Sequence, residues 1–100
     1  MKQIVVRYKT RSEKADENGQ LIEKVFKELQ AKSPDGVRYL ALRLADGTFL
    51  HFSAVDGGTS PITKLEAFQS FQNGIKERCV EPPQPSDATI VGNYRMLDQG

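Results

Sequence analysis

Hydrophobic positions in the first third of the chain change their spacing once, and the change separates two predicted elements. Residues 2–8 carry consecutive β-branched side chains at Ile4, Val5 and Val6, which is typical of a strand covered on both faces. Over 14–32 the apolar residues recur at helical spacing, and charged residues fill the opposite side. The pattern therefore predicts a strand followed by an amphipathic helix.

The middle of the chain predicts a β-hairpin. Two β-rich segments, 37–44 and 49–55, flank an Asp-Gly pair at 46–47. An Asp-Gly pair between two such segments is the strongest short-range hairpin signal. We expect Leu44 to lie opposite Phe49 in this hairpin.

The last third predicts a helix and a final strand. Thr63 and Glu66 match a capping box at the start of a helix over 63–79, because each side chain can bond the other residue's amide. The proline-rich stretch 81–85 cannot be helical and is expected to be extended. Residues 89–94 are predicted as the last strand.

The order strand-helix-strand-strand-helix-strand predicts a single ferredoxin-like α+β domain over residues 1–100. Each helix then connects two strands that run parallel and lie one place apart. The result is a four-stranded antiparallel sheet with both helices on one face. A chain of 100 residues has the size of one domain.

Both faces of the predicted hairpin are apolar. One face would carry Arg38, Leu40, Leu42, Leu44, Phe49, His51 and Ser53, and the other Val37, Tyr39, Ala41, Arg43, Leu50, Phe52 and Ala54. Helices on one side leave an apolar face uncovered, so we expect a homodimer with sheet packed on sheet. The alternative is a monomer in which loop 56–62 or segment 80–88 covers that face. The pattern does not decide which face meets the helices.

Composition narrows the classes of partner. The net charge is +1 and the basic residues are scattered, so neither nucleic acid nor an anionic membrane is expected as a partner. No stretch approaches the ~20 apolar residues of a membrane helix, and no signal-peptide pattern is present. Cys79 is the single cysteine, which favours a reducing compartment. We expect a cytoplasmic protein.

Candidate chemistry centres on His51, the only histidine. A histidine can act as a general base near neutral pH, or it can be a buried ring satisfied by hydrogen bonds. Arg38 could bind an anionic group, or it could reach the sheet rim or form an ion pair. One histidine and one cysteine fall short of a usual metal ligand set, and no phosphate-loop pattern occurs. We expect no metal and no cofactor.

Four stretches, 38–44, 46–47, 49–52 and 65–72, resemble small proteins of the dimeric α/β-barrel superfamily. These include the antibiotic-biosynthesis-monooxygenase-like domains. The resemblance covers nearly the whole chain, and its motifs are structural rather than catalytic. It implies a homodimer of ferredoxin-like subunits, with a pocket between sheet and helices or near the dimer seam. Some members oxygenate aromatic polyketides without metal or flavin, and others degrade haem. This chain lacks the tryptophan that both of those active sites commonly use.

Two hypotheses of function follow from the resemblance and the candidate residues. The first is a cofactor-independent, monooxygenase-like enzyme for a small hydrophobic phenolic substrate. His51 would take the phenolic proton, Phe49 would hold the ring, and Ser53 or Arg38 would lie near the resulting anion. The second is a non-catalytic ligand-binding or assembly module. An open pocket around His51 would favour the enzyme, and a sequestered His51 the module.

Overall fold

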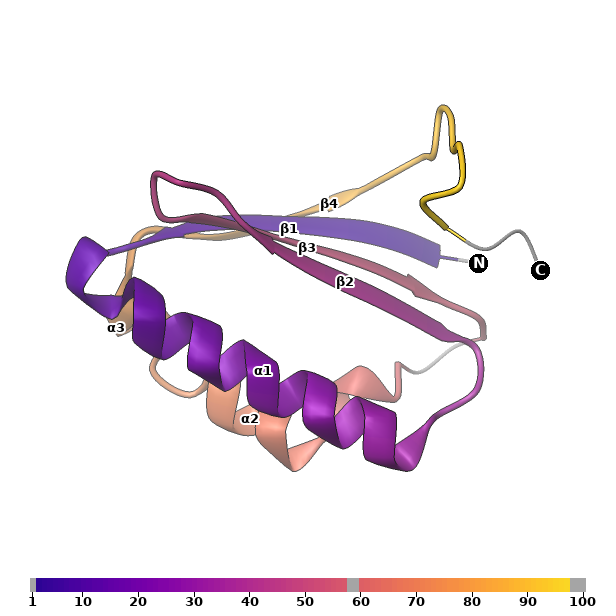
Figure 1. The fold of residues 1–100 in the computed structure, drawn as a ribbon, viewed down its shortest axis with the longest axis horizontal. Coiled ribbons are helices and arrows are strands. Elements are labelled where there is room, and N and C mark those ends of the chain that lie inside the picture. Colours follow the sequence, from indigo (N-terminus) through magenta and orange to yellow (C-terminus); the bar gives the residue numbers. More distant parts are fainter. Residues whose placement is uncertain (1, 58–59, 98–100) are drawn as a thin grey trace.

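The sheet and its helices form two layers in the computed structural model, which describes residues 2–57 and 60–97 (Figure 1). The strands have the order β2-β3-β1-β4, and every neighbouring pair is antiparallel. All helices lie on one face of the sheet. The elements are β1 (Lys2–Thr10), η1 (Ser12–Lys14), α1 (Ala15–Lys32), β2 (Val37–Arg43), β3 (Thr48–Val55), η2 (Ile62–Lys64), α2 (Glu66–Gln72), α3 (Ile75–Arg78) and β4 (Cys79–Asp87). The predicted ferredoxin-like α+β fold is confirmed.

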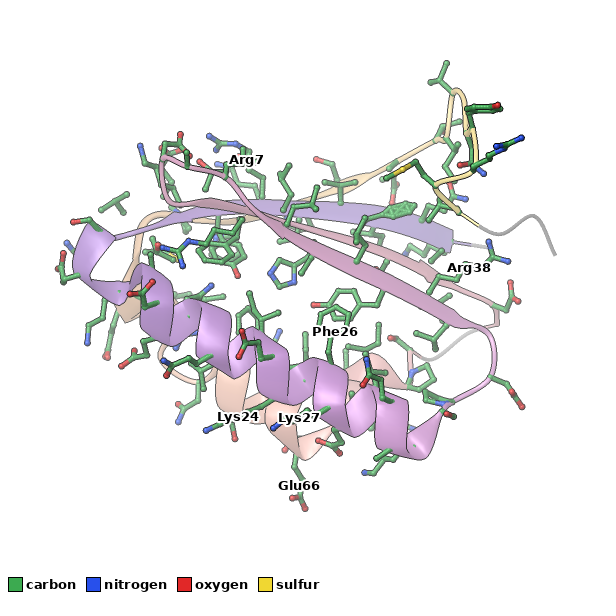
Figure 2. All side chains as sticks on the ribbon, viewed as in Figure 1. Arg7, Lys24, Phe26, Lys27, Arg38 and Glu66 are labelled. Carbon is green, nitrogen blue, oxygen red and sulfur yellow. The ribbon has the colours of Figure 1, made fainter. Side chains whose placement is uncertain are left out.

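The core lies between the sheet and the helices because each layer turns its apolar side inward. Along α1 the apolar spacing directs Ile22 and Val25 toward the sheet. Figure 2 shows Phe26 on this inner side, whereas Lys24 and Lys27 point away from the sheet. The buried hydrophobic cluster consists of Tyr8, Ile22, Val25, Phe49, Leu65, Phe71 and Cys79.

The hairpin forms as predicted, but its register differs by one residue. Arg43 pairs with Phe49, where the sequence predicted Leu44. The turn is longer because Leu44 donates its amide to the Thr48 carbonyl oxygen, and the Thr48 amide donates to the Asp46 carboxylate. A shift of one residue moves every side chain of a strand to the other face. The predicted assignment of β2 to the two faces is therefore wrong.

This register determines which residues of β2 meet the helices. Tyr39 and Ala41 share the helix-covered face with His51. Leu40, Leu42 and Leu44 lie on the open face, where they are 41%, 48% and 42% exposed.

The last strand is also placed differently from the prediction. It is β4, which contains the proline-rich stretch, and no strand forms over 89–94. β4 lies at the sheet edge and pairs only with β1. Proline lacks an amide hydrogen, but an edge strand has one side on which no ladder bond is needed. The register shifts between Arg7 and Thr10, and Val6 lies opposite Pro85.

The predicted helix over 63–79 is interrupted. It divides into η2, α2 and α3, with Gly74 between the last two at a φ of 79°. This left-handed conformation favours glycine and ends the helical path.

The predicted capping box does not form. The Thr63 hydroxyl donates to the Ser60 carbonyl oxygen instead of capping the helix. The amide of Ala67 donates to the Glu28 carboxylate at 2.8 Å, so a residue of α1 caps α2. A carboxylate at a helix start satisfies a free amide and suits the helix dipole. A long-range contact thus replaces the expected local one.

Two glycines give opposite predictions for stability. Gly47 has a φ of 88° in the hairpin turn, so Gly47→Ala should lower the free energy of unfolding by about 1–2 kcal/mol. Gly19 lies in α1, and no neighbouring atom comes within 4 Å of the place an alanine methyl group would take. Gly19→Ala should therefore raise the free energy of unfolding by about 0.5–1 kcal/mol. Urea denaturation of both variants measures the difference. Equal effects would contradict the turn geometry.

Candidate functional site

A cavity of about 580 Å³ lies between the helix-covered face of the sheet and the segment from η2 to α3. Its wall is mostly apolar, and its polar groups come from three neighbouring strands and from Ser60, Thr63 and Gln72 on the helical side. A concave apolar site with few polar groups is typical of small-molecule binding. The lining residues are Lys2, Ile4, Val6, Tyr8, Tyr39, His51, Ser53, Val55, Gly57, Ser60, Ile62, Thr63, Phe68, Gln72, Ile75, Pro83 and Pro85.

His51 lines this cavity and is held between two tyrosines. The Tyr8 hydroxyl is 2.8 Å from His51 Nε2, and the Tyr39 hydroxyl is 2.5 Å from Nδ1. Tyr8 comes from β1 and Tyr39 from β2, so the three strands together fix the ring. Both ring nitrogens of His51 are hydrogen-bonded to tyrosine hydroxyls. His51 would therefore affect a bound ligand through a tyrosine hydroxyl rather than by direct contact.

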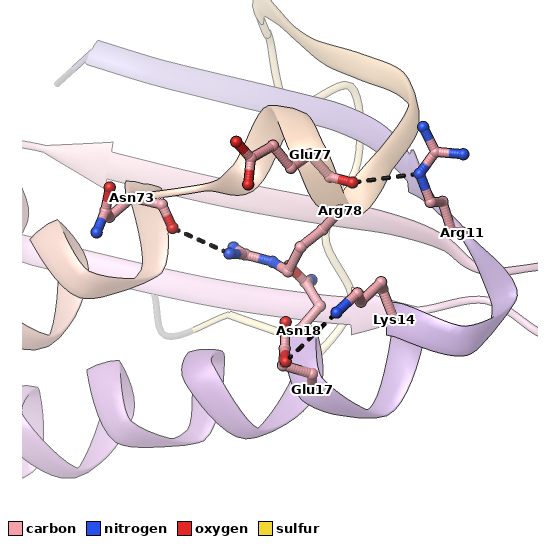
Figure 3. Close-up of polar contacts among 7 residues, drawn as sticks. All are labelled: Arg11, Lys14, Glu17, Asn18, Asn73, Glu77 and Arg78. Carbon is pink, nitrogen blue, oxygen red and sulfur yellow. Dashed lines mark hydrogen bonds and ion pairs between the residues drawn. The ribbon is translucent and has the colours of Figure 1, made fainter.

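The hydrogen bonds continue from Tyr8 into the core. Asn18 Nδ2 donates to the Tyr8 hydroxyl oxygen at 2.9 Å, and Arg78 Nε donates to Asn18 Oδ1 at 3.0 Å. Figure 3 shows the Arg78 guanidinium between Asn18 and Asn73, whose carbonyl oxygen accepts a bond at 3.1 Å. The Phe71 carbonyl oxygen accepts a further one.

Arg78 is the charged member of this buried network. Arg78 is only 5% exposed, and Asn18 is fully buried. Within residues 2–57 and 60–97 its hydrogen bonds go to neutral amide oxygens, and it forms no ion pair with a carboxylate. A buried cation satisfied only by dipoles polarises the groups bonded to it.

Burial sets the protonation states at the site. It lowers the pKa of His51 from 6.5 to about 4, because a charged ring would lose its hydration. The same cause raises the pKa values of Tyr8 and Tyr39 above the ordinary value of 10.0. At pH 7 the ring is neutral and both hydroxyls keep their protons.

The structure brings two of the four predicted site residues to the cavity. His51 and Ser53 line it. Phe49 is 2% exposed and lies beneath Tyr8, with stacked rings whose centroids are 5.4 Å apart. Arg38 lies on the opposite face, in a separate hollow, because of the one-residue change in register.

Sequence reasoning missed the partners of His51. Tyr39 was expected on the other face, so its bond to His51 could not be foreseen. Asn18 had a usable signal, since it lies three residues after Ala15 and four before Ile22 on the apolar side of α1. Arg78 is the last residue of α3 and lies within the helix predicted over 63–79, and nothing local marks it as buried.

Neither a metal site nor a membrane span is found in the part of the chain that the structure describes. No three histidine, cysteine or acidic side chains there lie close enough to hold a metal ion. Its helices are too short or too polar to cross a bilayer.

Comparison with solved structures identifies the fold. Rv0793 of Mycobacterium tuberculosis superposes with a TM-score of 0.72 at 14% identity, covering 92% of this chain and 96% of that one. A Nitrosomonas europaea protein, provisionally named an antibiotic biosynthesis monooxygenase, gives 0.74 at 13% identity over 92% and 100%. A Bacteroides thetaiotaomicron protein with the same provisional name gives 0.74 at 12% identity over 97% and 95%.

The chain has the fold of the antibiotic-biosynthesis-monooxygenase-like proteins. The subunit fold expected from the resemblance in the sequence is thereby confirmed. No protein-family profile and no curated protein sequence matches the chain. The comparison therefore gives the fold, and the cavity between sheet and helices is described from the residues of this chain.

The low pKa of His51 predicts that stability falls as the pH is lowered. Its folded pKa of about 4 lies below the unfolded value of 6.5, so the unfolded chain binds the extra proton in between. From pH 7 to pH 5 the free energy of unfolding should drop by about 2 kcal/mol. Urea denaturation at both pH values measures this drop.

The variant His51→Gln is the control for this pH effect. It should lose most of the drop, because no other residue is a histidine. Glu28 and Asp46, whose pKa values are lowered by hydrogen bonds, titrate below this window. An NMR titration that gave His51 an ordinary pKa would refute the assignment.

Proposed function

We propose that this chain is a cofactor-independent, monooxygenase-like enzyme that oxidises a small hydrophobic phenolic molecule. The observation that carries the proposal is the Tyr39 hydroxyl, hydrogen-bonded to His51, in a residue that lines a mostly apolar cavity. The names given to proteins of the same fold support the reaction class. The cavity volume of about 580 Å³ suits a molecule of one or a few aromatic rings.

The chemistry requires a phenolate. A phenol that has lost its proton is electron-rich enough to react with O₂ directly. For 1-naphthol the reaction would be 1-naphthol plus O₂ giving 1,4-naphthoquinone plus water. One oxygen atom becomes the new carbonyl and the other leaves as water, so the four electrons come from the substrate. A protein that stabilises the phenolate would therefore promote the reaction.

Tyr39 and His51 would act on the phenolic oxygen together. With a pKa of about 4, His51 is too weak a base to keep the proton at pH 7. The proton would leave to water at the rim, where Lys2, Gly57 and Thr63 are exposed. His51 would act through Tyr39, which touches the substrate oxygen.

The apolar wall would hold the aromatic ring. Phe68 and Ile75 come from the helices and Val6 from the sheet, so the ring would lie between the two layers. Ser53 pairs with Tyr39 across the hairpin and lines the same cavity. It would provide a second hydrogen bond to the substrate.

A non-catalytic binding module is the second candidate. The observation that favours it is the engagement of both nitrogens of His51 by tyrosines, which leaves a neutral and fully satisfied ring. Such a network can simply orient a hydrogen bond to a bound ligand. Binding of 1-naphthol without O₂ consumption would support this candidate over the enzyme.

Removal of the proposed substrate contact should abolish most of the activity. Tyr39→Phe is expected to lower kcat/KM for 1-naphthol by about 100-fold, the usual effect of losing one donor to a developing anion. His51→Ala should give a similar loss. The measurement is O₂ uptake together with quinone absorbance, with one O₂ consumed per quinone. Lys24→Gln, on the outer side of α1, is the matched control. Unchanged rates in both site variants would exclude the proposed roles.

We further propose that two copies of the chain associate through the open sheet face. Leu40 and Leu42 of β2, with Leu44 just after it, form an apolar row that no helix covers. The segment after β4 adds the exposed side chains of Val91 and Met96. A second copy would bury both apolar regions at once, and a two-fold dimer is the commonest closed assembly.

A charge in the leucine row should separate the two copies. Leu42→Lys is expected to convert a dimer into a monomer, because the interface would bury an unpaired ammonium group. Light scattering coupled to size exclusion measures the mass. Lys27→Leu, on the outer side of α1, is the control and should leave the dimer unchanged. A wild-type chain that stays monomeric at high concentration would disprove the association.

A further inference from the structure

Arg78 fixes the orientation of the Asn18 side chain. Its Nε–H donates to Asn18 Oδ1 at 3.0 Å. An amide that accepts at its oxygen must present its NH₂ group on the other side. Asn18 therefore donates to Tyr8, and a flipped amide would place two donors against each other.

The orientation of Asn18 in turn fixes the tautomer of His51. The Tyr8 oxygen accepts from Asn18, and its own hydrogen has one acceptor within reach among the described residues, His51 Nε2. Tyr8 lines the cavity but is only 1% exposed, so its hydroxyl has little access to water. With Nε2 as the acceptor, the neutral ring carries its hydrogen on Nδ1. That hydrogen points to the Tyr39 oxygen.

The last member of this series of hydrogen bonds is the hydroxyl group of Tyr39. The Tyr39 oxygen accepts from His51, so its own hydrogen is not used within the network. Tyr39 lines the cavity. Every bond of the network thus points in one direction, from the buried guanidinium to the cavity.

We propose that Arg78 and Asn18 are positioning residues that force Tyr39 to act as a donor, so that the cavity selects ligands with an anionic or strongly accepting oxygen. This inference deepens the proposed function, because it implies that the substrate is held as its phenolate. Aligned hydrogen bonds polarise one another, and a donor bonded to an anion is about twice as strong as one bonded to a neutral oxygen. The neutral phenol gains less.

The tautomer of His51 is the first test and needs no ligand. A long-range ¹H–¹⁵N correlation spectrum at pH 7 reports which ring nitrogen carries the hydrogen, and the single histidine makes the assignment unambiguous. We expect hydrogen on Nδ1 in the wild type. Hydrogen on Nε2 would overturn the proposal.

Asn18→Asp should keep the bond from Arg78 and reverse the hydrogen bonds from residue 18 through Tyr8 and His51 to Tyr39. The new carboxylate would accept from Arg78 with one oxygen and from Tyr8 with the other. Tyr8 would then accept from His51 Nε2, and Tyr39 would donate to Nδ1. The spectrum should show hydrogen on Nε2 in this variant. Gln30→Glu, an exposed position on α1, makes the same change of charge and should keep the wild-type tautomer.

Ligand selection is tested with 4-nitrophenol, whose phenolate absorbs at a longer wavelength than the phenol. Tyr39→Phe should raise the pKa of the bound probe by about one unit, a tenfold change, because the phenolate loses its donor. In the Asn18→Asp background the same substitution should not raise it. The charged and titratable groups that line the cavity are Lys2, Tyr8, Tyr39 and His51, with none from α2 or α3. The effects of Lys2 and of the new charge cancel in this double-mutant cycle.

The outcomes separate this inference from the enzyme proposal. Additive effects of the two substitutions would overturn the inference, as would equal affinity for 4-nitrophenol and 4-nitroanisole or binding of neither. If Asn18→Asp does not fold, Tyr8→Phe replaces it and should reduce the effect of Tyr39→Phe. Non-additive effects of the two substitutions without turnover of 1-naphthol would support the inference. They would count only against the proposal that the chain is an enzyme.

Discussion

The hydrogen-bond requirement of one buried arginine organises the interior of this protein. Arg78 has little access to solvent and no carboxylate partner in the described chain, so amide oxygens must satisfy it. One of these amides belongs to Asn18. Its NH₂ group donates to the Tyr8 hydroxyl, and that hydroxyl is hydrogen-bonded to His51. Leaving any of these groups unpaired would cost about 1–3 kcal/mol. The conformation of the site therefore depends on residues far from the cavity.

The elements could be predicted from the sequence because their signals are local. The Asp-Gly turn, the β-branched residues of β1 and the apolar spacing of α1 each report on their own segment. The register could not be predicted, because it depends on how Leu44, Asp46 and Thr48 share hydrogen bonds inside the turn. This one-residue change in register decides whether Arg38 or Tyr39 lies on the same face of the sheet as His51. Of the four residues proposed for the candidate site, His51 and Ser53 line the cavity, whereas Phe49 and Arg38 do not.

Tertiary contacts override local rules in the second half of the chain. The proline-rich stretch was predicted to be extended, with the last strand at 89–94, yet the stretch itself forms β4 because its edge position removes the disadvantage of proline. Thr63 and Glu66 had the sequence of a capping box, yet Glu28 of α1 supplies the cap from a distance. In both cases the deciding partner is remote in sequence. Reasoning within a window of residues cannot find such a partner, although the helix and strand order survives.

The same sheet carries two kinds of surface, and the difference explains why its faces would have different roles. The helix-covered face holds a series of hydrogen-bonded polar side chains that are costly to bury, and the cavity lies at Tyr39, where this series ends. The open face holds leucines that are costly to expose. A stability-driven design would place leucines inside and polar groups outside. Polar groups kept inside at such cost point to a function for the direction in which their hydrogen bonds run.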